Sequence, residues 1–296
     1  MKHIVTKEHL NPDVITSIFY FTRLCAQNHS WPYPNKILGT IFFEPSTRTR
    51  WSFEAAMLKL NGKVISTEMA KDSSSDKKGE SFQDTLKTCS QYADILAVRH
   101  SEDNIITDNY KYSEVPVINC GEGKGSHPTQ GLLDYFTIKE KFNNLEGKTI
   151  LFTGDIFYSR TIQSLLDILD IMNEKMNLVF YDDTNASAMN IIGFNVDNPN
   201  FNLKFTQDVK EYLPKADILY MTRHQKEKNG FNRDISDFIL HQENINFLKD
   251  EAIIMHPLPR NSEISNLIDN DPRAYYFKQV KNGLHVRMGI LEYIMS

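Results

Sequence analysis

Residues 37–61 read ILGTIFFEPSTRTRWSFEAAMLKLN and predict a strand that runs directly into a helix. The apolar run Ile37–Phe43 is typical of a buried strand, and Pro45 ends it. The segment Thr47–Asn61 then carries apolar residues at helical spacing, and Gly62 follows its end as a stop signal. A buried strand followed at once by a helix is the unit from which α/β sheets are built.

Strand–helix alternation continues along the rest of the chain in two series. In the first series we expect strands at Val64–Thr67, Ile95–Val98 and Val115–Asn119 and a helix at Phe82–Tyr92. In the second series we expect strands at Lys148–Thr153, Leu178–Tyr181, Ala216–Met221 and Ala252–His256 and a helix at Arg160–Met172. Further helices are expected between the two series, at Gln130–Phe142, and at the end of the chain, at Leu284–Ile294.

This alternation predicts an α/β protein with two doubly wound domains, each built on a parallel sheet, joined by interdomain helices. A length of 296 residues suits two domains rather than one. In open α/β folds, ligands bind outside the carboxyl ends of the strands. We therefore look for functional residues where the predicted strands end, and expect a ligand cleft there.

Charge and cysteine usage exclude several classes of protein. The net charge of −5 argues against a general nucleic-acid binder, which is usually strongly basic. Cys25, Cys89 and Cys120 form no C-x-x-C pair, which favours free thiols in a reducing cytosol. Residues 1–9 contain no apolar signal segment, and no apolar run approaches the roughly 18–20 residues that span a bilayer. We expect a cytoplasmic protein that binds neither nucleic acid nor membrane.

The motif S-T-R-T-R (46–50) lies between the predicted strand and helix of the opening stretch. A helix N-terminus presents unsatisfied N–H groups and the positive end of the helix dipole, which suits a phosphate. The hydroxyls of Ser46, Thr47 and Thr49 and the planar guanidinium of Arg48 add further donors. The glycines and lysine of a nucleotide-binding P-loop are missing. The motif favours a phosphate site over the alternative of a simple helix cap with surface arginines.

Two more candidates follow strands of the first series. Arg99 comes directly after Ile95–Val98, and His127 lies in a Gly-rich turn after the next strand. The alternatives are an ordinary surface arginine and a core histidine. The polar, cationic loop Ser73–Ser81 fits either a solvated loop before a helix or a lid over an anion.

In the second series, Arg160 opens a helix, and Arg223 and Gln225 follow a strand. The carboxyl ends of parallel strands lie at one edge of a sheet, so these side chains are expected on the same rim. Two arginines from separate strands make a receptor for a dicarboxylate. The sequence contains no evident nucleophile–base pair and no cluster with metal-ligand spacing, so we expect neither a cofactor nor a metal.

From about Lys2 to its last helix, the chain resembles the catalytic chains of the aspartate/ornithine carbamoyltransferase family. The resemblance rests on six motifs: F-F-E-P-S-T-R-T-R-x-S-F-E (42–54), K-K-G-E-S (77–81), H-P-T-Q (127–130), G-D-x-x-x-x-R-T (154–161), Y-M-T-R-x-Q-K-E (220–227) and H-P-L-P-R (256–260). The T-R-x-Q and H-P-L-P-R segments resemble the aspartate branch, and Leu258 stands where the ornithine branch usually has a cysteine.

For one substrate, carbamoyl phosphate, the resemblance implies a complete set of ligands. Its phosphate would be held by Ser46, Thr47, Arg48, Thr49 and Arg99. Its carbonyl oxygen would face Thr49, Arg99 and His127, which with Arg48 form the catalytic group. Its amino group would meet Gln130 and the carbonyl of Leu258, whose bond to Pro259 is cis in the family.

For aspartate, the resemblance implies binding by Lys78, Arg160, Arg223 and Gln225. Ser74 and Lys78 would come from the neighbouring subunit of a homotrimer. Residues 1–130 with 284–296 would form the carbamoyl phosphate-binding domain, and residues 131–283 the aspartate-binding domain. Lys228, where an arginine is usual, and Ser159, where a glycine is usual, depart from the family pattern.

The resemblance therefore implies transfer of a carbamoyl group from carbamoyl phosphate to L-aspartate, a step of pyrimidine biosynthesis. Two alternatives stay open: transfer to ornithine or another amine, and a catalytically silent subunit that serves an interaction. The ornithine alternative would require a pocket for an ammonium side chain, against which Arg223 and Gln225 argue. The silent alternative would require damaged motifs, and none is damaged. The sequence also leaves room for a separate regulatory or pathway partner chain.

Overall fold

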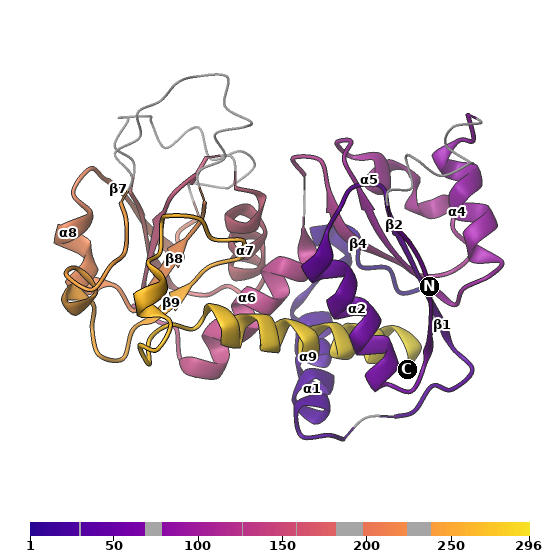
Figure 1. Ribbon diagram of the computed structural model, residues 1–296, viewed down its shortest axis with the longest axis horizontal. Coiled ribbons are helices and arrows are strands. Elements are labelled where there is room, and N and C mark those ends of the chain that lie inside the picture. The colour runs from indigo at the N-terminus through magenta and orange to yellow at the C-terminus, as the bar shows by residue number, and fades with distance from the viewer. Residues whose placement is uncertain (30, 69–78, 126, 158, 182–197, 224–237) are drawn as a thin grey trace. The chain divides into compact units, whose positions relative to one another are not determined.

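The computed structural model describes the chain except for residues 30, 69–78, 126, 158, 182–197 and 224–237 (Figure 1). The chain divides into two compact units. Unit 1 contains Met1–Phe136 and Lys281–Ser296, and unit 2 contains Thr137–Val280. This division does not test which substrate each part binds, so the predicted substrate domains, divided at 130/131 and 283/284, stay a prediction.

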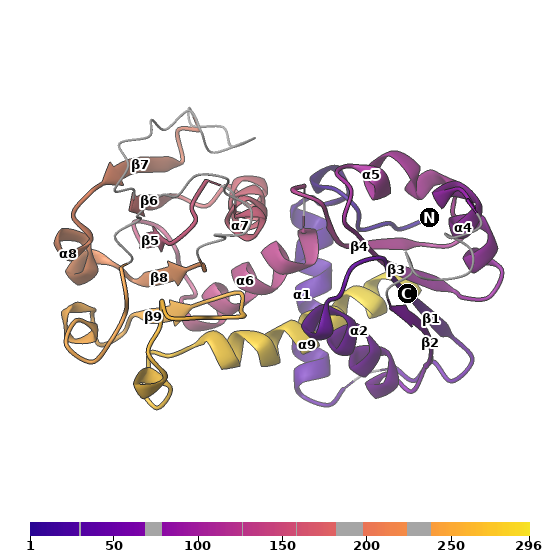
Figure 2. The same ribbon diagram turned by 45° about the horizontal axis from the view of Figure 1, so that its top comes forward.

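Each unit is built on one parallel sheet. In unit 1 the strand order is β2-β1-β3-β4, with β1 at Ile37–Phe42, β2 at Lys63–Glu68, β3 at Ile95–His100 and β4 at Val117–Glu122. In unit 2 the order is β7-β6-β5-β8-β9 (Figure 2), with β5 at Thr149–Thr153, β6 at Met176–Tyr181, β7 at Phe201–Thr206, β8 at Ile218–Met221 and β9 at Ile253–Met255. The predicted fold class is therefore confirmed.

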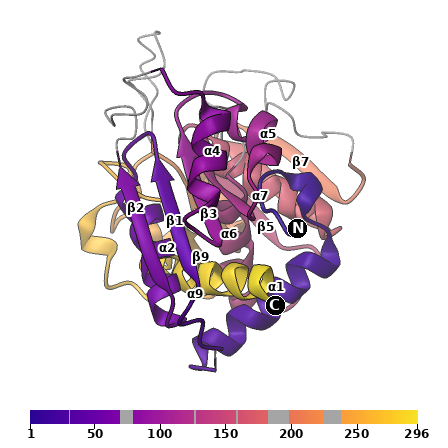
Figure 3. The ribbon, with the colours of Figure 1, turned by 90° about the vertical axis from the view of Figure 1, so that its right-hand side faces the viewer.

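Helices cover the unit 1 sheet on both faces, as the nearly continuous burial along β1 requires. Ile41 and Phe43 belong to a buried cluster with Leu86 of α4 and Ile106 of α5, whereas α2 packs against β1 and β2. Figure 3 shows α4 in front of the sheet. The described α-helices of this unit are α1 (Pro12–Ala26), α2 (Thr47–Lys59), α4 (Phe82–Ser90) and α5 (Ile105–Asn109), with parts of α6 (Pro128–Lys141) and α9 (Tyr276–Met295).

Unit 2 carries stacked aromatic rings across its sheet. Phe152 of β5 stacks on Phe180 of β6 at 4.9 Å between ring centroids, and Phe180 stacks on Phe205 of β7 at 5.3 Å. The α-helices described wholly within this unit are α7 (Arg160–Ile171) and α8 (Val209–Tyr212). Short 3₁₀ helices complete the two units at Lys7–His9, Tyr110–Tyr112, Leu213–Lys215, Ile245–Phe247 and Asn266–Ile268.

The elements differ from the expected ones at a few boundaries. β4 begins at Val117 because Pro116 has no N–H for the strand ladder. β3 runs on to His100, so Arg99 lies within the strand rather than after it. α9 begins at Tyr276, well before the expected start at 284.

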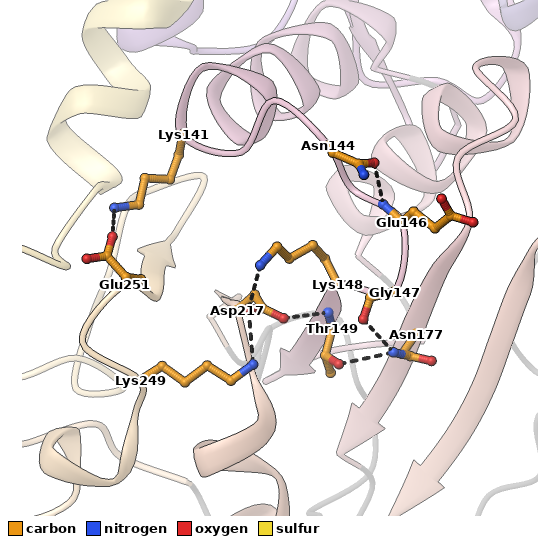
Figure 4. Close-up of polar contacts among 10 residues, drawn as sticks. All are labelled: Lys141, Asn144, Glu146, Gly147, Lys148, Thr149, Asn177, Asp217, Lys249 and Glu251. Carbon is orange, nitrogen blue, oxygen red and sulfur yellow. Dashed lines mark hydrogen bonds and ion pairs between the residues drawn. The ribbon is translucent and has the colours of Figure 1, made fainter.

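A polar network ties the amino ends of the unit 2 strands together (Figure 4). Asp217, just before β8, accepts from the backbone N–H of Thr149 at 3.0 Å and pairs with Lys148 at 3.2 Å and Lys249 at 3.0 Å. Burial acts to raise the pKa of Asp217, but these bonds outweigh it and hold that pKa below its ordinary value. The network lies at the edge opposite the strands' carboxyl ends, so we assign it to the scaffold.

Within the described part of the chain, no helix is long and apolar enough to cross a membrane.

Candidate active site

The turn between β1 and α2 presents a helix N-terminus that lacks acidic residues in its first turn. Ser46 is the N-cap residue, and its side chain makes no capping hydrogen bond. The N–H groups of the first helical turn, Thr47, Arg48 and Thr49, have no acceptor within the helix. Thr49 is buried, whereas Thr47 and Arg48 are exposed. This turn therefore combines backbone donors, hydroxyls and a guanidinium at the positive end of a helix dipole, as predicted from the sequence.

Arg99 lies beside this turn. It pairs with Phe42 in the strand register, and its carbonyl accepts from the N–H of Phe43 at 2.9 Å. Its guanidinium pairs with Glu44 at 2.6 Å through Nη2 and donates to the carbonyl of Cys120 at 3.1 Å through Nη1. The fork of Arg99 is thus oriented between the β1–α2 turn and β4. Glu44 was not predicted, because nothing in the sequence shows that it reaches the next strand.

His127 and Gln130 lie at the start of α6, after β4. Both side chains are buried, and the His127 carbonyl accepts from the N–H of Gln130 at 2.9 Å. Thr129 Oγ1 is 3.4 Å from His127 Nδ1. The Gln130 side chain donates through Nε2 to Oδ1 of Asp134, one helical turn further on, at 2.9 Å. Unit 1 therefore places Ser46–Thr49, Arg99, His127 and Gln130 at or after the carboxyl ends of β1, β3 and β4.

Glu122 holds the loop that leads to His127. Its buried carboxylate accepts from the N–H groups of Ile106 at 2.8 Å and Thr107 at 3.1 Å and from Asn119 Nδ2 at 2.9 Å. The Thr107 hydroxyl donates to the same carboxylate. Sequence reasoning missed this residue, because a glutamate in a Gly-rich turn looks solvent-exposed until its backbone partners are known.

In unit 2, the ends of β5 and β8 are in direct contact. The N–H of Thr222 donates to the carbonyl of Thr153 at 2.9 Å. Gly154 has a φ of +93°, and a Cβ there would lie 1.9 Å from the Thr222 carbonyl, so only glycine fits. Arg223 follows Thr222 at this edge, and Arg160 begins α7 after β5. The structure thus places both arginines after adjacent parallel strands, as predicted.

The segment after β9 is fixed by a buried histidine. Leu258 has a φ of +56° and a cis bond to Pro259, as the resemblance implied. The N–H of Leu258 donates to His256 Nδ1 at 2.8 Å, so the proton of the neutral ring lies on Nε2, which is 2.8 Å from Glu263 Oε1. Burial raises the pKa of Glu263, but hydrogen bonds from His256 and from backbone amides outweigh it and lower that pKa. Leu258 therefore has a defined backbone conformation.

Two further arginines of the sequence motifs, Arg50 and Arg260, form ion pairs within the fold and are not assigned to a substrate. Arg50 pairs with Glu54 one turn along α2 at 3.1 Å. Arg260 forms a two-pronged pair with Asp269 and donates to the Tyr276 hydroxyl at 2.9 Å. Neither was assigned to a substrate from the sequence.

Ser74, Lys78 and Gln225 lie outside the described residues, as does Lys228. Ser159, the other departure from the family pattern, is a buried N-cap residue whose hydroxyl is 2.9 Å from that of Thr161. Across the described residues, no group of three His, Cys, Asp or Glu side chains is placed to hold a metal ion.

Two family descriptions cover nearly the whole chain. Residues 2–140 match "Aspartate/ornithine carbamoyltransferase, carbamoyl-P binding domain", and residues 146–294 match "Aspartate/ornithine carbamoyltransferase, Asp/Orn binding domain". The chain belongs to the aspartate/ornithine carbamoyltransferase family. The resemblance stated from the sequence is thereby confirmed.

Individual members of this family match over their full length. The aspartate carbamoyltransferase catalytic subunit of Clostridium perfringens is 42% identical over 305 residues, covering 100% of this chain and 98% of that protein. The solved catalytic subunit of M. Jannaschii aspartate transcarbamoylase has a TM-score of 0.86 at 34% identity, covering 100% of this chain and 98% of that one. The Trypanosoma cruzi enzyme solved with carbamoyl phosphate and aspartate has a TM-score of 0.85 at 31% identity, covering 100% and 97%.

Proposed function

We propose that the chain is an aspartate carbamoyltransferase, which transfers the carbamoyl group of carbamoyl phosphate to the amino group of L-aspartate. The products are N-carbamoyl-L-aspartate and phosphate. The observation that carries the proposal is the N-terminus of α2, where the donors of Ser46–Thr49 closely follow Glu44, which pairs with the fork of Arg99 at 2.6 Å. The three cysteines are free thiols, which supports the cytoplasm as the place of this reaction.

For carbamoyl phosphate, we assign the phosphate to Ser46, Thr47, Arg48, Thr49 and Arg99. The carbonyl oxygen is assigned to Thr49, Arg99 and His127. The amino group is assigned to the Gln130 side chain and the Leu258 carbonyl, with Pro259 fixing the turn that follows. The buried positions of Thr49, His127 and Gln130 support these roles, because donors and acceptors act more strongly when water is excluded.

For aspartate, we assign the two carboxylates to Arg160, Arg223 and Gln225. Arginine forks bind carboxylates in a two-pronged geometry, which an ornithine ammonium group cannot use. The relatives from Clostridium acetobutylicum and Clostridium perfringens, which match over 90% and 98% of their own length, are named aspartate carbamoyltransferase catalytic subunits, which supports the same acceptor here.

The reaction follows from these groups. The amine nitrogen of aspartate attacks the carbonyl carbon, and negative charge develops on the carbonyl oxygen. Donors from Thr49, Arg99 and His127 stabilise that charge. The bond between the carbon and the phosphate oxygen then breaks, and the departing phosphate takes the proton released by the amine. Binding two anionic reactants side by side, against their repulsion, supplies much of the rate enhancement.

We further propose that the chain forms a homotrimer with shared active sites, in which Ser74 and Lys78 of one subunit complete the site of the next. Trp51 and Leu58, seven residues apart on α2, are 65% and 61% exposed, and Ile65 on the edge strand β2 is 52% exposed. Exposed apolar side chains of this size suit a subunit interface. The segment that carries Ser74 and Lys78 follows β2 directly.

The test measures product formation with equal concentrations of L-aspartate and L-ornithine as acceptors. Carbamoyl aspartate should form with aspartate, and ornithine should give little or no product. Faster product formation with ornithine would overturn the acceptor assignment, and no product with either acceptor would overturn the activity.

A matched pair of variants tests the phosphate site. Arg48→Lys should lower kcat by roughly 10²-fold, because lysine cannot reproduce the fork. Arg50→Lys keeps a charge for Glu54 and should stay close to the parent. Equal losses in the two variants would count against Arg48 as a phosphate ligand.

A further inference from the structure

Gln130 is held by a buried carboxylate that has no assigned role in the reaction. Asp134 is 0% exposed on α6, and its Oδ1 accepts from Gln130 Nε2 at 2.9 Å. An ionised carboxylate accepts hydrogen bonds and cannot donate them. The amide of Gln130 must therefore turn its NH₂ group towards Asp134, which leaves Oε1 on the other side of the amide.

This orientation matters because an amide side chain can present either a donor or an acceptor to a ligand. The amino group of carbamoyl phosphate offers only donors, so it requires the oxygen of Gln130. If the amide were reversed, two NH₂ groups would face each other in a buried place, which is costly. Asp134 thus excludes the orientation that would repel the substrate.

A buried arginine interacts electrostatically with Asp134. Arg287 on α9 is 5% exposed, lies with its guanidinium 5.3 Å from the Phe53 ring centroid, and donates through Nη1 to Ser52 Oγ at 3.0 Å. Burial lowers the pKa of Arg287 to about 10, still well above neutral, and the charge of Asp134 opposes that shift. A Cβ at position 283 would lie 2.9 Å from Arg287 Nη1, so Gly283 leaves room for this side chain.

We propose that Asp134 is a positioning residue that fixes the Gln130 amide with its oxygen towards the carbamoyl amino group. In this proposal, the positive charge of Arg287 favours the ionised carboxylate of Asp134, which can only accept hydrogen bonds. The proposal rests on the proposed function, since it takes Gln130 as a ligand of that amino group. It makes Asp134 a determinant of specificity for an amide over a ketone, although Asp134 itself does not touch the substrate.

The experiment compares two stable phosphonates by calorimetry, with the full chain. Phosphonoacetamide keeps the amino group, and acetonylphosphonate has a methyl group in its place. The parent should bind phosphonoacetamide about tenfold more tightly than acetonylphosphonate, the usual effect of one net hydrogen bond. In Asp134→Asn, Arg287 attracts the new amide oxygen, so the new NH₂ faces Gln130 and reverses it. The ratio of the affinities for phosphonoacetamide and acetonylphosphonate should then fall to about one, while the affinity for inorganic phosphate stays within about twofold of the parent's.

Asp134→Glu retains an acceptor-only carboxylate and should keep the preference even if its melting temperature falls. Gln130→Met should remove the preference, and adding Asp134→Asn to it should change nothing further, because Asp134 acts through Gln130. If Asp134→Asn does not fold, Asp134→Ser replaces it, with an expected drop of about threefold or more in preference.

An unchanged preference in Asp134→Asn would overturn the proposal. A parallel loss of phosphate affinity would also overturn it, because it would show a general scaffold role. A parent that binds both phosphonates equally would instead remove Gln130 from the amino-group site, and so count against that part of the proposed function.

Discussion

His127 is one of two well-buried histidines in unit 1, and the two should respond differently to truncation. The His127 carbonyl, not its side chain, accepts the first hydrogen bonds of α6, so His127→Ala leaves them in place. We expect its kcat to fall by roughly 10²-fold, the usual loss for one oxyanion donor, with the melting temperature nearly unchanged. Steady-state kinetics at saturating substrates, with thermal melting, measures both.

His100 provides the matched control. Its ring packs 4.6 Å from that of Phe43, and its Nδ1 accepts from the N–H of Glu102 at 3.0 Å. His100→Ala should cost more than about 1 kcal/mol of unfolding free energy while kcat stays within about threefold of the parent. If His127→Ala also keeps its turnover within threefold, His127 is structural and its assignment is wrong.

The site residues that could be predicted form a local pattern in the sequence, whereas the missed ones depend on partners elsewhere in the fold. Ser46–Thr49 could be predicted because a helix N-terminus, hydroxyls and an arginine are adjacent in the sequence. Glu44, Glu122 and Asp134 were missed because their partners lie on another strand, on the helix α5 or one helical turn away. A carboxylate that orients another side chain carries no local pattern of its own. The roles of the predicted residues stay a prediction until tested.

β5 and β8 are joined at their amino ends by Asp217, and this connection should depend on pH. The pKa of Asp217 is lowered in the folded chain, so its ionisation stabilises the fold fully above the unfolded value of 3.8. That contribution is lost as the pH falls from there through the folded pKa. Asp217→Asn should therefore cost about 2 kcal/mol at pH 7, and the difference from the parent should shrink below pH 3.8.

Urea unfolding of both proteins between pH 7 and pH 3 measures this difference. Glu251→Gln is the control, since Glu251 is highly exposed where it pairs with Lys141 at 2.9 Å and should contribute little at any pH. A gap between parent and Asp217→Asn that persists unchanged at pH 3 would show that the loss does not come from the charge.

Elements with strong periodicity or clear boundaries were predictable, and others were not. The strand of β1 and the helix α2 follow from one continuous stretch of sequence. α1 was missed although Asn11 caps it by accepting from Val14 N–H at 2.9 Å and Pro12 begins it. β7 was also missed, because its alternation of apolar and polar residues covers only six positions at the edge of the sheet. Tertiary pairing, rather than local preference, fixes such an edge strand.

The homotrimer can be tested with mixed subunits. Lys78→Ala and Arg48→Ala should each be nearly inactive alone, because every site lacks one of the two residues. If Lys78 reaches the neighbouring site, each mixed trimer holds one intact site, so random exchange should restore about a quarter of the parent activity. The recovery is measured by denaturing, mixing and refolding equal amounts of the two variants and then assaying with aspartate.

A mixture of Arg48→Ala with His127→Ala is the control. Arg48 and His127 are both contributed to a site by the same subunit, so no combination of these two variants rebuilds an intact site. Recovery in that control, or none with Lys78→Ala, would show that the site is not shared in the proposed way.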